Sequence, residues 1–215
     1  MDSGTGTIET VLFDYGGVLA EEGFRGGLYA IAQLNECDAE TFYEEVVRII
    51  ADCGYLTGRG DEAAFWNHVR QECGIRQADA LLRNEILRRF VLRPAMLAVA
   101  ARLRAGGLQV GIISDQTNWL DELDRRDGFF VCFDRVFNSY HLQASKHQGG
   151  LFDAVAGQLQ AEPAQILIVD DNPGNIEKAR QRDFAAILYK NKDGFLREML
   201  KLFPNIFGQA YPYCV

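Results

Sequence analysis

Short apolar runs alternate with longer amphipathic segments along most of this chain. The short runs predict buried strands at residues 10–13, 108–113, 135–137, 166–169 and 185–188. The longer segments repeat apolar positions at helical spacing and predict helices over residues 95–104, 120–126, 151–160, 175–182 and 195–203. Strands that alternate with helices form a parallel sheet with right-handed crossovers and helices on both faces. The pattern therefore predicts an α/β fold with a doubly wound parallel sheet.

The stretch between the first two expected strands follows a different pattern. Leu28, Ile31 and Ala32 form one apolar helical face, and further amphipathic runs continue to Val91 with no strand pattern among them. A run of helices between two strands of one sheet is an insertion. We therefore expect an inserted helical domain over residues 21–92 and an α/β core domain formed by residues 1–20 and 93–215.

Composition and charge narrow the possible partners. The chain has 215 residues, of which 48% are hydrophobic and 24% charged, as in an ordinary globular protein. A formal net charge of -8 argues against a nucleic-acid partner, because phosphate backbones are held by dense lysine and arginine patches. The sequence has no apolar stretch of roughly 20 residues and no signal-peptide pattern, and its five scattered cysteines indicate reduced thiols. We expect a cytoplasmic protein without a membrane partner; its oligomeric state is left open.

Carboxylates follow two of the expected strands. Asp14 comes directly after residues 10–13, and Asp170 and Asp171 close the run at residues 166–169. The carboxyl ends of parallel strands meet at one edge of a sheet, so we expect these side chains to converge there. Close like charges repel unless a positive group neutralises them, and a magnesium ion and Lys146 are the natural candidates. The sequence therefore indicates phosphoryl chemistry.

Four segments, taken together and in order, carry a resemblance to a known family. They are Phe-Asp-Tyr-Gly-Gly-Val-Leu at residues 13–19, Gly-Ile-Ile-Ser-Asp at 111–115, Ser-Lys at 145–146 and Ile-Val-Asp-Asp-Asn-Pro-Gly-Asn at 168–175. Taken singly, the aspartates and the serine also fit turns or helix caps, and the lysine fits a solvated surface charge. In this order they resemble the motifs of the haloacid dehalogenase-like hydrolases. The helical insertion is similar to the small helical cap that many members carry after the first motif.

The resemblance implies a nucleophile and a metal site. Asp14 would attack phosphorus and form an aspartyl-phosphate, which divides one difficult step into two. Magnesium would be held by Asp14, by the backbone carbonyl of Gly16 and by Asp171, with Asp170 bound directly or through water. Asn175 would orient the loop of the fourth motif. The implied reaction is hydrolysis of a small phosphorylated metabolite by a magnesium-dependent phosphatase.

The resemblance also implies the groups that bind the transferring phosphoryl oxygens. These are the Ser114 hydroxyl and the backbone amides near Asp115 and around Tyr15 and Gly16. Lys146 would bridge the nucleophile and the phosphate as a fixed positive charge. Specificity is expected to come from the cap, where the loop at residues 56–60 and the segment at 21–25 are the parts expected to face the site. Arg59 or Arg25 could reach a second anionic group of the substrate.

The chain departs from the family pattern in three places. Gly16 occupies the position where phosphatase members normally carry a second aspartate that moves protons, a role worth roughly 10²–10⁴ in rate. Asp115 replaces the Asn or Thr of many members, and His147 replaces the proline that usually follows the lysine. The glycine favours substrates with good leaving groups, such as acyl or anomeric sugar phosphates. His68 and His147 are conceivable substitutes for the missing aspartate.

Two other functions remain open at the level of sequence. One is a catalytically weak or inactive family member that uses its acidic groove to bind a ligand or partner, with Gly16 as the mark of lost turnover. The other is a 2-haloacid dehalogenase, which also attacks with an aspartate but acts on carbon without magnesium. The pair Asp170 and Asp171 favours the metal-dependent branch.

Overall fold

The computed structural model describes residues 7–208 and contains one sheet of five parallel strands in the order β3-β2-β1-β4-β5. The strands are β1 (Thr10–Phe13), β2 (Gln109–Ser114), β3 (Arg135–Asn138), β4 (Ile166–Asp170) and β5 (Ala185–Leu188). Each lies within one residue, at either end, of a run expected from the apolar pattern. The predicted α/β fold with a doubly wound parallel sheet is confirmed.

The residue pairing of β1 aligns the ends of its two neighbouring strands, β2 and β4, with its own end. Phe13, the last residue of β1, pairs with Ile112 of β2 on one side and with Val169 of β4 on the other. The next residue of each strand therefore lies at the same edge of the sheet. The chain carries Asp14 after β1 and Asp170 at the end of β4, so two carboxylates reach this edge from neighbouring strands.

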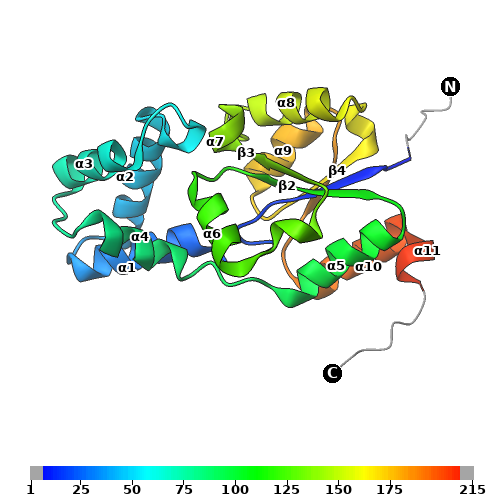
Figure 1. The fold of residues 1–215 in the computed structure, drawn as a ribbon, viewed down its shortest axis with the longest axis horizontal. Coiled ribbons are helices and arrows are strands. Elements are labelled where there is room, and N and C mark those ends of the chain that lie inside the picture. The colour runs from blue at the N-terminus through cyan, green and yellow to red at the C-terminus, as the bar shows by residue number, and fades with distance from the viewer. Residues whose placement is uncertain (1–6, 209–215) are drawn as a thin grey trace.

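Alternation along the strands divides the core into two layers. Val11 and Phe13 belong to a buried cluster that includes residues of α5, α6 and α10, whereas Leu12 and Ile168 belong to a cluster that includes residues of α8 and α9. Figure 1 shows α8 and α9 on one side of the sheet and α5 and α10 on the other. The helices are α5 (Pro94–Ala105), α6 (Trp119–Asp127), α8 (Gly150–Leu159), α9 (Pro173–Arg180) and α10 (Lys192–Leu202).

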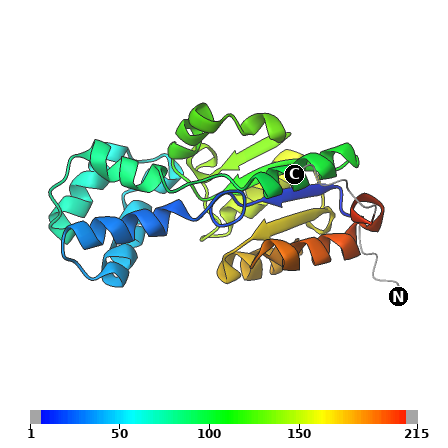
Figure 2. The same cartoon turned by 90° about the horizontal axis from the view of Figure 1, so that it is seen from below.

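The remaining long helices form a separate group between β1 and β2, which we call the helical insert (residues 21–92). Its elements are α1 (Gly23–Leu34), α2 (Ala39–Asp52), the 3-10 turn η1 (Tyr55–Thr57), α3 (Glu62–Cys73) and α4 (Asp79–Leu87). Figures 1 and 2 show this group beyond the carboxyl ends of the strands. The two connecting segments lie side by side, because the Glu21 amide donates to the Val91 carbonyl and the Arg93 amide to the Leu19 carbonyl, each at 2.8 Å.

Local capping explains the main differences from the expected boundaries. The helix expected over residues 175–182 is α9, which begins at Pro173 because the Asn172 side chain accepts from the amides of Gly174 and Asn175. The helical pattern that runs to Val91 ends at Leu87, and the Val91 carbonyl beyond it accepts from the amide of Glu21 in the other connecting segment. The amphipathic pattern also missed short elements: η2 (Phe130–Cys132), α7 (Ser139–Leu142), η3 (Pro163–Gln165) and α11 (Pro204–Phe207).

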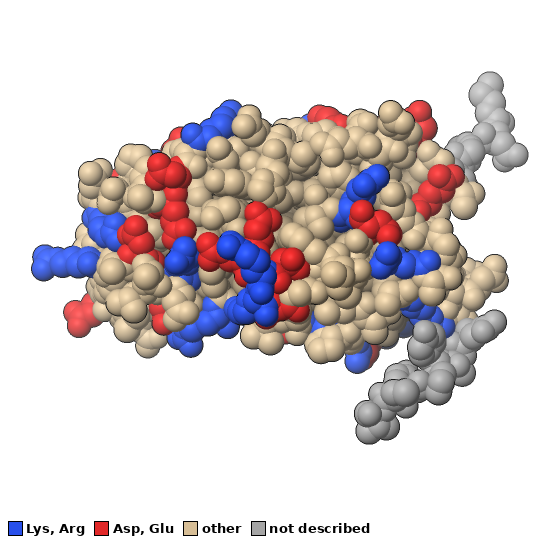
Figure 3. All heavy atoms as spheres, viewed as in Figure 1, with Lys and Arg blue, Asp and Glu red and all other residues tan. Residues whose placement is uncertain are grey.

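The surface charges and the lengths of the helices can be compared with the expectation of no nucleic-acid partner and no membrane partner. The face drawn in Figure 3 carries acidic and basic side chains interspersed, without a continuous basic area. Within residues 7–208, the helices are all too short or too polar to span a bilayer. The four described cysteines are unpaired, and Cys214 lies outside the described residues.

Candidate active site

Three aspartates converge at the carboxyl edge of the sheet. Asp14 follows β1, Asp170 ends β4, and Asp171 is the next residue. Each offers a carboxylate oxygen, and these oxygens all lie within 4.8 Å of one another. Parallel pairing of β1 with β4 is the reason for this closeness, as expected from the sequence. A set of oxygen donors at this spacing fits a hard divalent cation.

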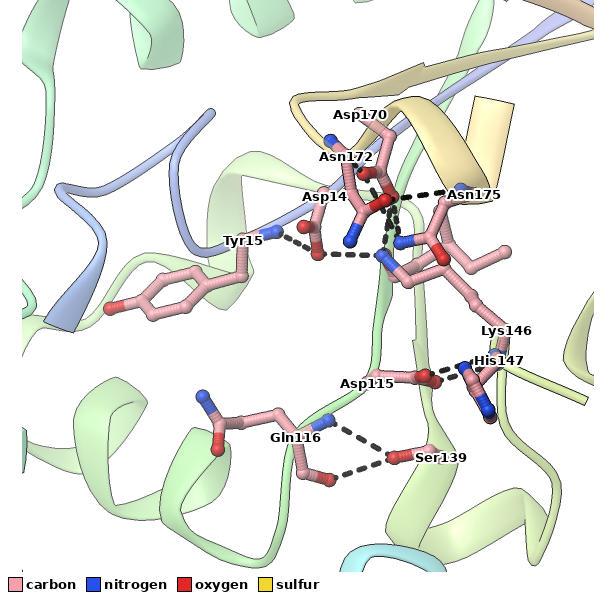
Figure 4. A network of polar contacts seen from close by, with 11 residues as sticks. Asp14, Tyr15, Asp115, Gln116, Ser139, Lys146, His147, Asp170, Asn172 and Asn175 are labelled. Carbon is pink, nitrogen blue, oxygen red and sulfur yellow. Dashed lines mark hydrogen bonds and ion pairs between the residues drawn. The ribbon is translucent and has the colours of Figure 1, made fainter. Parts of the chain in front are cut away.

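Lys146 reaches this cluster from the loop before α8. Its side chain is only 1% exposed, and its Nζ lies 2.9 Å from Asp14 Oδ1 and 2.6 Å from Asp170 Oδ2. The same ammonium group donates to the Ile113 carbonyl at 3.3 Å. Figure 4 shows the ammonium between the two carboxylates. One buried cation thus partly neutralises three clustered acids.

Asp170 is held more firmly than the other two aspartates. It is fully buried, and besides Lys146 it accepts from the Asn172 amide at 2.8 Å. The Asn175 side-chain amide donates to both of its oxygens, at 3.2 and 3.1 Å. Asn175 therefore orients the end of β4, which agrees with the role expected for it.

The charges in the cluster shift one another's protonation. Burial raises the pKa of Asp14 to about 7; Lys146 opposes this rise and the nearby Asp170 adds to it. Burial and repulsion by Asp170 also raise the pKa of Asp171. Burial alone would lower the pKa of Lys146, but Asp14, Asp170 and Asp115 outweigh it and the net direction is upward. The site therefore carries more negative charge than its single lysine compensates, which favours uptake of another cation.

Asp115 supports the loop that carries the lysine. Its carboxylate accepts from the backbone amides of Lys146 at 2.8 Å and His147 at 3.3 Å. In Figure 4 this carboxylate faces the loop, and the His147 ring points away from Asp14. The Asp115 side chain is thus engaged in positioning this loop.

Residues 15–17 form a tight turn beside the aspartates. The Tyr15 amide donates to Asp14 Oδ1 at 2.8 Å, and the buried Tyr15 ring lies 4.9 Å from that of Phe129 and 5.5 Å from that of Phe90. Gly17 has φ 76°, and a Cβ added to it would lie 2.0 Å from Asp171 Oδ2. A side chain at Gly17 is therefore incompatible with the observed position of Asp171.

The other expected site residues are placed as follows. Ser114 ends β2 and is buried at the same edge of the sheet. Arg59 is exposed and its Nε donates to Thr57 Oγ1 at 3.1 Å, while the Arg25 guanidinium lies 4.3 Å from the centre of the Tyr43 ring. Within the described part of the chain, no hydrogen bond or ion pair joins Arg59 or Arg25 to the aspartates.

Contacts between the helical insert and the core were not anticipated from the sequence. The Glu62 carboxylate at the start of α3 accepts from Trp119 Nε1 of α6 at 3.1 Å. The Tyr55 hydroxyl donates to Asn118 Oδ1 at 2.6 Å. The sequence does not reveal the contact between Glu62 and the core, because Trp119 lies 57 positions away and follows no periodic pattern with Glu62. These contacts seat η1 and α3 against the core beside the site.

Fold and site together place the chain among α/β proteins with an acidic centre at the carboxyl edge of a parallel sheet. The sequence profile described as haloacid dehalogenase-like hydrolase matches residues 8–181. The chain therefore belongs to the haloacid dehalogenase-like hydrolases. This confirms the family that the four motifs indicated.

Individual relatives show how far the similarity extends. Bifunctional epoxide hydrolase 2 from Rattus norvegicus is 30% identical over 129 residues, which are 57% of this chain but only 23% of that protein. A structure of the family enzyme BT-2542 from Bacteroides thetaiotaomicron, in complex with magnesium and inorganic phosphate, superposes with a TM-score of 0.66 at 19% identity and covers 85% of this chain and 94% of that one. L-2-haloacid dehalogenase from Xanthobacter autotrophicus gives a TM-score of 0.60 at 19% identity, with 90% and 83% covered. Because both structures are only 19% identical to this chain, their similarity to it shows a shared fold alone.

Proposed function

We propose that this protein is a magnesium-dependent phosphatase that hydrolyses a small phosphorylated metabolite through an aspartyl-phosphate on Asp14. The observation that carries the proposal is the buried Lys146, 2.9 Å from Asp14 and 2.6 Å from Asp170, beside a third carboxylate. The BT-2542 complex with magnesium and inorganic phosphate supports it, since that enzyme has the same fold. The pair Asp170 and Asp171 beside Asp14 favours this reaction over that of a 2-haloacid dehalogenase, which attacks carbon without magnesium.

The donor set fits a magnesium ion. Asp14, Asp171 and the backbone carbonyl of Gly16 would hold the ion, and Asp170 would bind directly or through water. Carboxylate oxygens within 4.8 Å of one another suit a hard cation, because their like charges repel unless a positive group lies between them. When bound, magnesium screens the negative charges of the carboxylates and the phosphate.

The protein's own groups have distinct tasks in the proposed reaction. Asp14 attacks phosphorus, so it must be ionised, and Lys146 favours the ionised form by direct contact. The Ser114 hydroxyl and the backbone amides near Asp115 and Tyr15 bind the phosphoryl oxygens. Asp170 keeps Lys146 in position, since it is itself fixed by two asparagines.

The helical insert is proposed to act as a cap over the phosphoryl site. It lies beyond the carboxyl ends of the strands, and its two connecting segments run side by side as a hinge would. A cap of this size restricts the site to small substrates and excludes water during phosphoryl transfer. The exposed Arg59 on this cap is available for a second anionic group of the substrate.

The test is hydrolysis of acetyl phosphate and 4-nitrophenyl phosphate with and without magnesium, in the wild type and in Asp14→Asn. We expect turnover that requires magnesium and a loss of about a thousandfold or more in Asp14→Asn. Asp153→Asn is the matched control, because Asp153 is an exposed aspartate on α8 paired with Arg182. Absence of turnover with every activated phosphate would point to a binding protein, and halide release from a 2-haloacid without metal to a dehalogenase.

A further inference from the structure

The proposed reaction needs a group that protonates the leaving group, and none of the residues assigned so far can do this. Gly16 has no side chain to protonate the leaving group, and the two histidines considered for this task are both exposed, His68 on α3 and His147 with its ring turned away from Asp14. An alkoxide or phenoxide is a poor leaving group without a proton. Another group near Gly16 is therefore required for ordinary phosphate esters.

Glu22 lies close to the place that a side chain on Gly16 would occupy. A Cβ added to Gly16 would lie 3.9 Å from Glu22 Oε1, with only the Phe90 ring edge closer, at 3.3 Å. The carboxyl oxygens of an aspartate extend roughly 2.4 Å beyond its Cβ, by standard covalent geometry. The Glu22 carboxylate thus lies near the place that an aspartate at position 16 would reach.

The backbone of α1 holds this carboxylate in place. Glu22 is the N-cap of α1, and its oxygens accept from the Phe24 amide at 3.1 Å and the Arg25 amide at 2.7 Å. A side chain with both oxygens anchored to the start of a helix has one orientation rather than many. Glu22 is therefore preorganised although it belongs to a connecting segment.

Glu22 lines the same cavity as Asp171, one of the three clustered aspartates. The volume of this cavity is about 610 Å³, and its wall includes Asp171, Gly17 and Glu22. This volume accommodates the leaving group of a small metabolite. Glu21 also lines the cavity, but Arg93 donates to both of its oxygens, at 2.9 and 2.8 Å, so Glu21 is already paired.

We propose that Glu22 is the catalytic residue that transfers protons in place of the aspartate missing at Gly16; this inference rests on the proposed phosphatase function. As the oxygen of Asp14 bonds to phosphorus and the bond to the leaving oxygen breaks, protonated Glu22 gives its proton to that oxygen. In the second step a water oxygen attacks phosphorus, its proton passes to the Glu22 carboxylate, and the bond from phosphorus to Asp14 breaks. The cycle returns Glu22 to its protonated form and releases inorganic phosphate.

The experiment compares a good and a poor leaving group in one variant. Glu22→Gln keeps an oxygen that can cap α1 but cannot give up a proton. We expect kcat/KM for phenyl phosphate to fall about 100-fold more than kcat/KM for 4-nitrophenyl phosphate, because only the poorer leaving group needs the proton. The ratio of the two values within one preparation does not depend on how much of the protein is folded. Asp38→Asn, which alters the exposed N-cap of α2, is the control and leaves the ratio unchanged.

Two results overturn the assignment of Glu22. One is an equal loss, or no loss, for both substrates in Glu22→Gln, which leaves Glu22 with capping alone. The other is a wild type that hydrolyses 4-nitrophenyl phosphate but not phenyl phosphate, since it then has no proton donor at all. Failure of the proposed function looks different, because the wild type then hydrolyses neither ester nor acetyl phosphate with magnesium.

Discussion

Asp14 has a side chain that is 14% exposed and lies beside two other carboxylates and one lysine, and this position has a consequence for stability. Its pKa is about 7 in the folded protein against an ordinary value of 3.8. Between these two values the folded state binds more protons than the unfolded state, so stability falls as pH rises through this interval. The group that the proposed reaction needs ionised therefore destabilises the metal-free fold at neutral pH.

Asp14→Asn should accordingly stabilise the metal-free protein above pH 7. The gain is at most about 4 kcal/mol, since each pKa unit corresponds to about 1.4 kcal/mol, and it should vanish near pH 4. Thermal unfolding of both proteins in the presence of a chelator, from pH 4 to pH 8, measures it. Parallel stability profiles for the two proteins would show that Asp14 has an ordinary pKa.

Lys146 has the opposite effect on stability. Lys146→Ala leaves Asp14 and the fully buried Asp170 without their cation, and such a loss typically costs about 3–5 kcal/mol. Lys201→Ala is the matched control: Lys201 is 70% exposed and, among the residues that the structure describes, forms its ion pair with Glu198 alone, so it should change stability by less than about 0.5 kcal/mol. Urea unfolding in the absence of metal measures both. Equal effects of the two substitutions would contradict the buried ion-pair account.

At the scale of elements, the strands could be predicted and the loops could not. Apolar runs locate β1 and β4, and parallel pairing then dictates that Asp14 and Asp170 meet. The sequence assigned Lys146 to the nucleophile and the phosphate, and the structure adds Asp170 as its partner at 2.6 Å. The sequence also could not predict the direction of the Asp115 side chain, whose carboxylate accepts from the backbone amides of Lys146 and His147. Such side-chain directions depend on loop conformation, which apolar periodicity does not encode.

The turn after β1 offers a test at this scale. Gly17 and Gly107 both have positive φ, 76° and 90°, so alanine strains the backbone at either position by about 1 kcal/mol. A Cβ at Gly17 would collide with Asp171, whereas a Cβ at Gly107 meets nothing within 4 Å. We expect Gly17→Ala to weaken magnesium binding at least tenfold and Gly107→Ala to leave it unchanged, as measured by calorimetric titration. Equal magnesium affinities would argue that Asp171 is not a ligand.

At the scale of the molecule, a few polar contacts hold the helical insert against the core. Glu62 accepts from Trp66 Nε1 and Trp119 Nε1, each at 3.1 Å, and from the Tyr55 hydroxyl at 3.3 Å. Trp66 belongs to the insert and Trp119 to the core, and the chain has only 2 tryptophans. Tryptophan fluorescence therefore reports on this junction alone.

Glu62→Ala should loosen the junction, because it leaves the indole N–H groups of Trp66 and Trp119 without this acceptor, whereas the Tyr55 hydroxyl keeps Asn118. We expect a red shift of the tryptophan emission and a loss of at least about 2 kcal/mol in stability, given a cost of roughly 1–3 kcal/mol for each unsatisfied buried donor. Glu45→Ala is the control, since Glu45 is a partly exposed glutamate on α2 that pairs with Arg48. An unchanged emission maximum in Glu62→Ala would mean that Glu62 does not hold the insert against the core.

The central claim is that Asp14 and Asp171 share a divalent cation and that Asp14 accepts the phosphoryl group. The most direct measurement is a crystal structure of the protein with magnesium and beryllium fluoride, a mimic of the phosphoryl group. We predict an ion bound by both carboxylates, with beryllium fluoride on the Asp14 carboxylate and contacted by Lys146. A well-ordered structure in which neither group is bound under saturating conditions would contradict the claim.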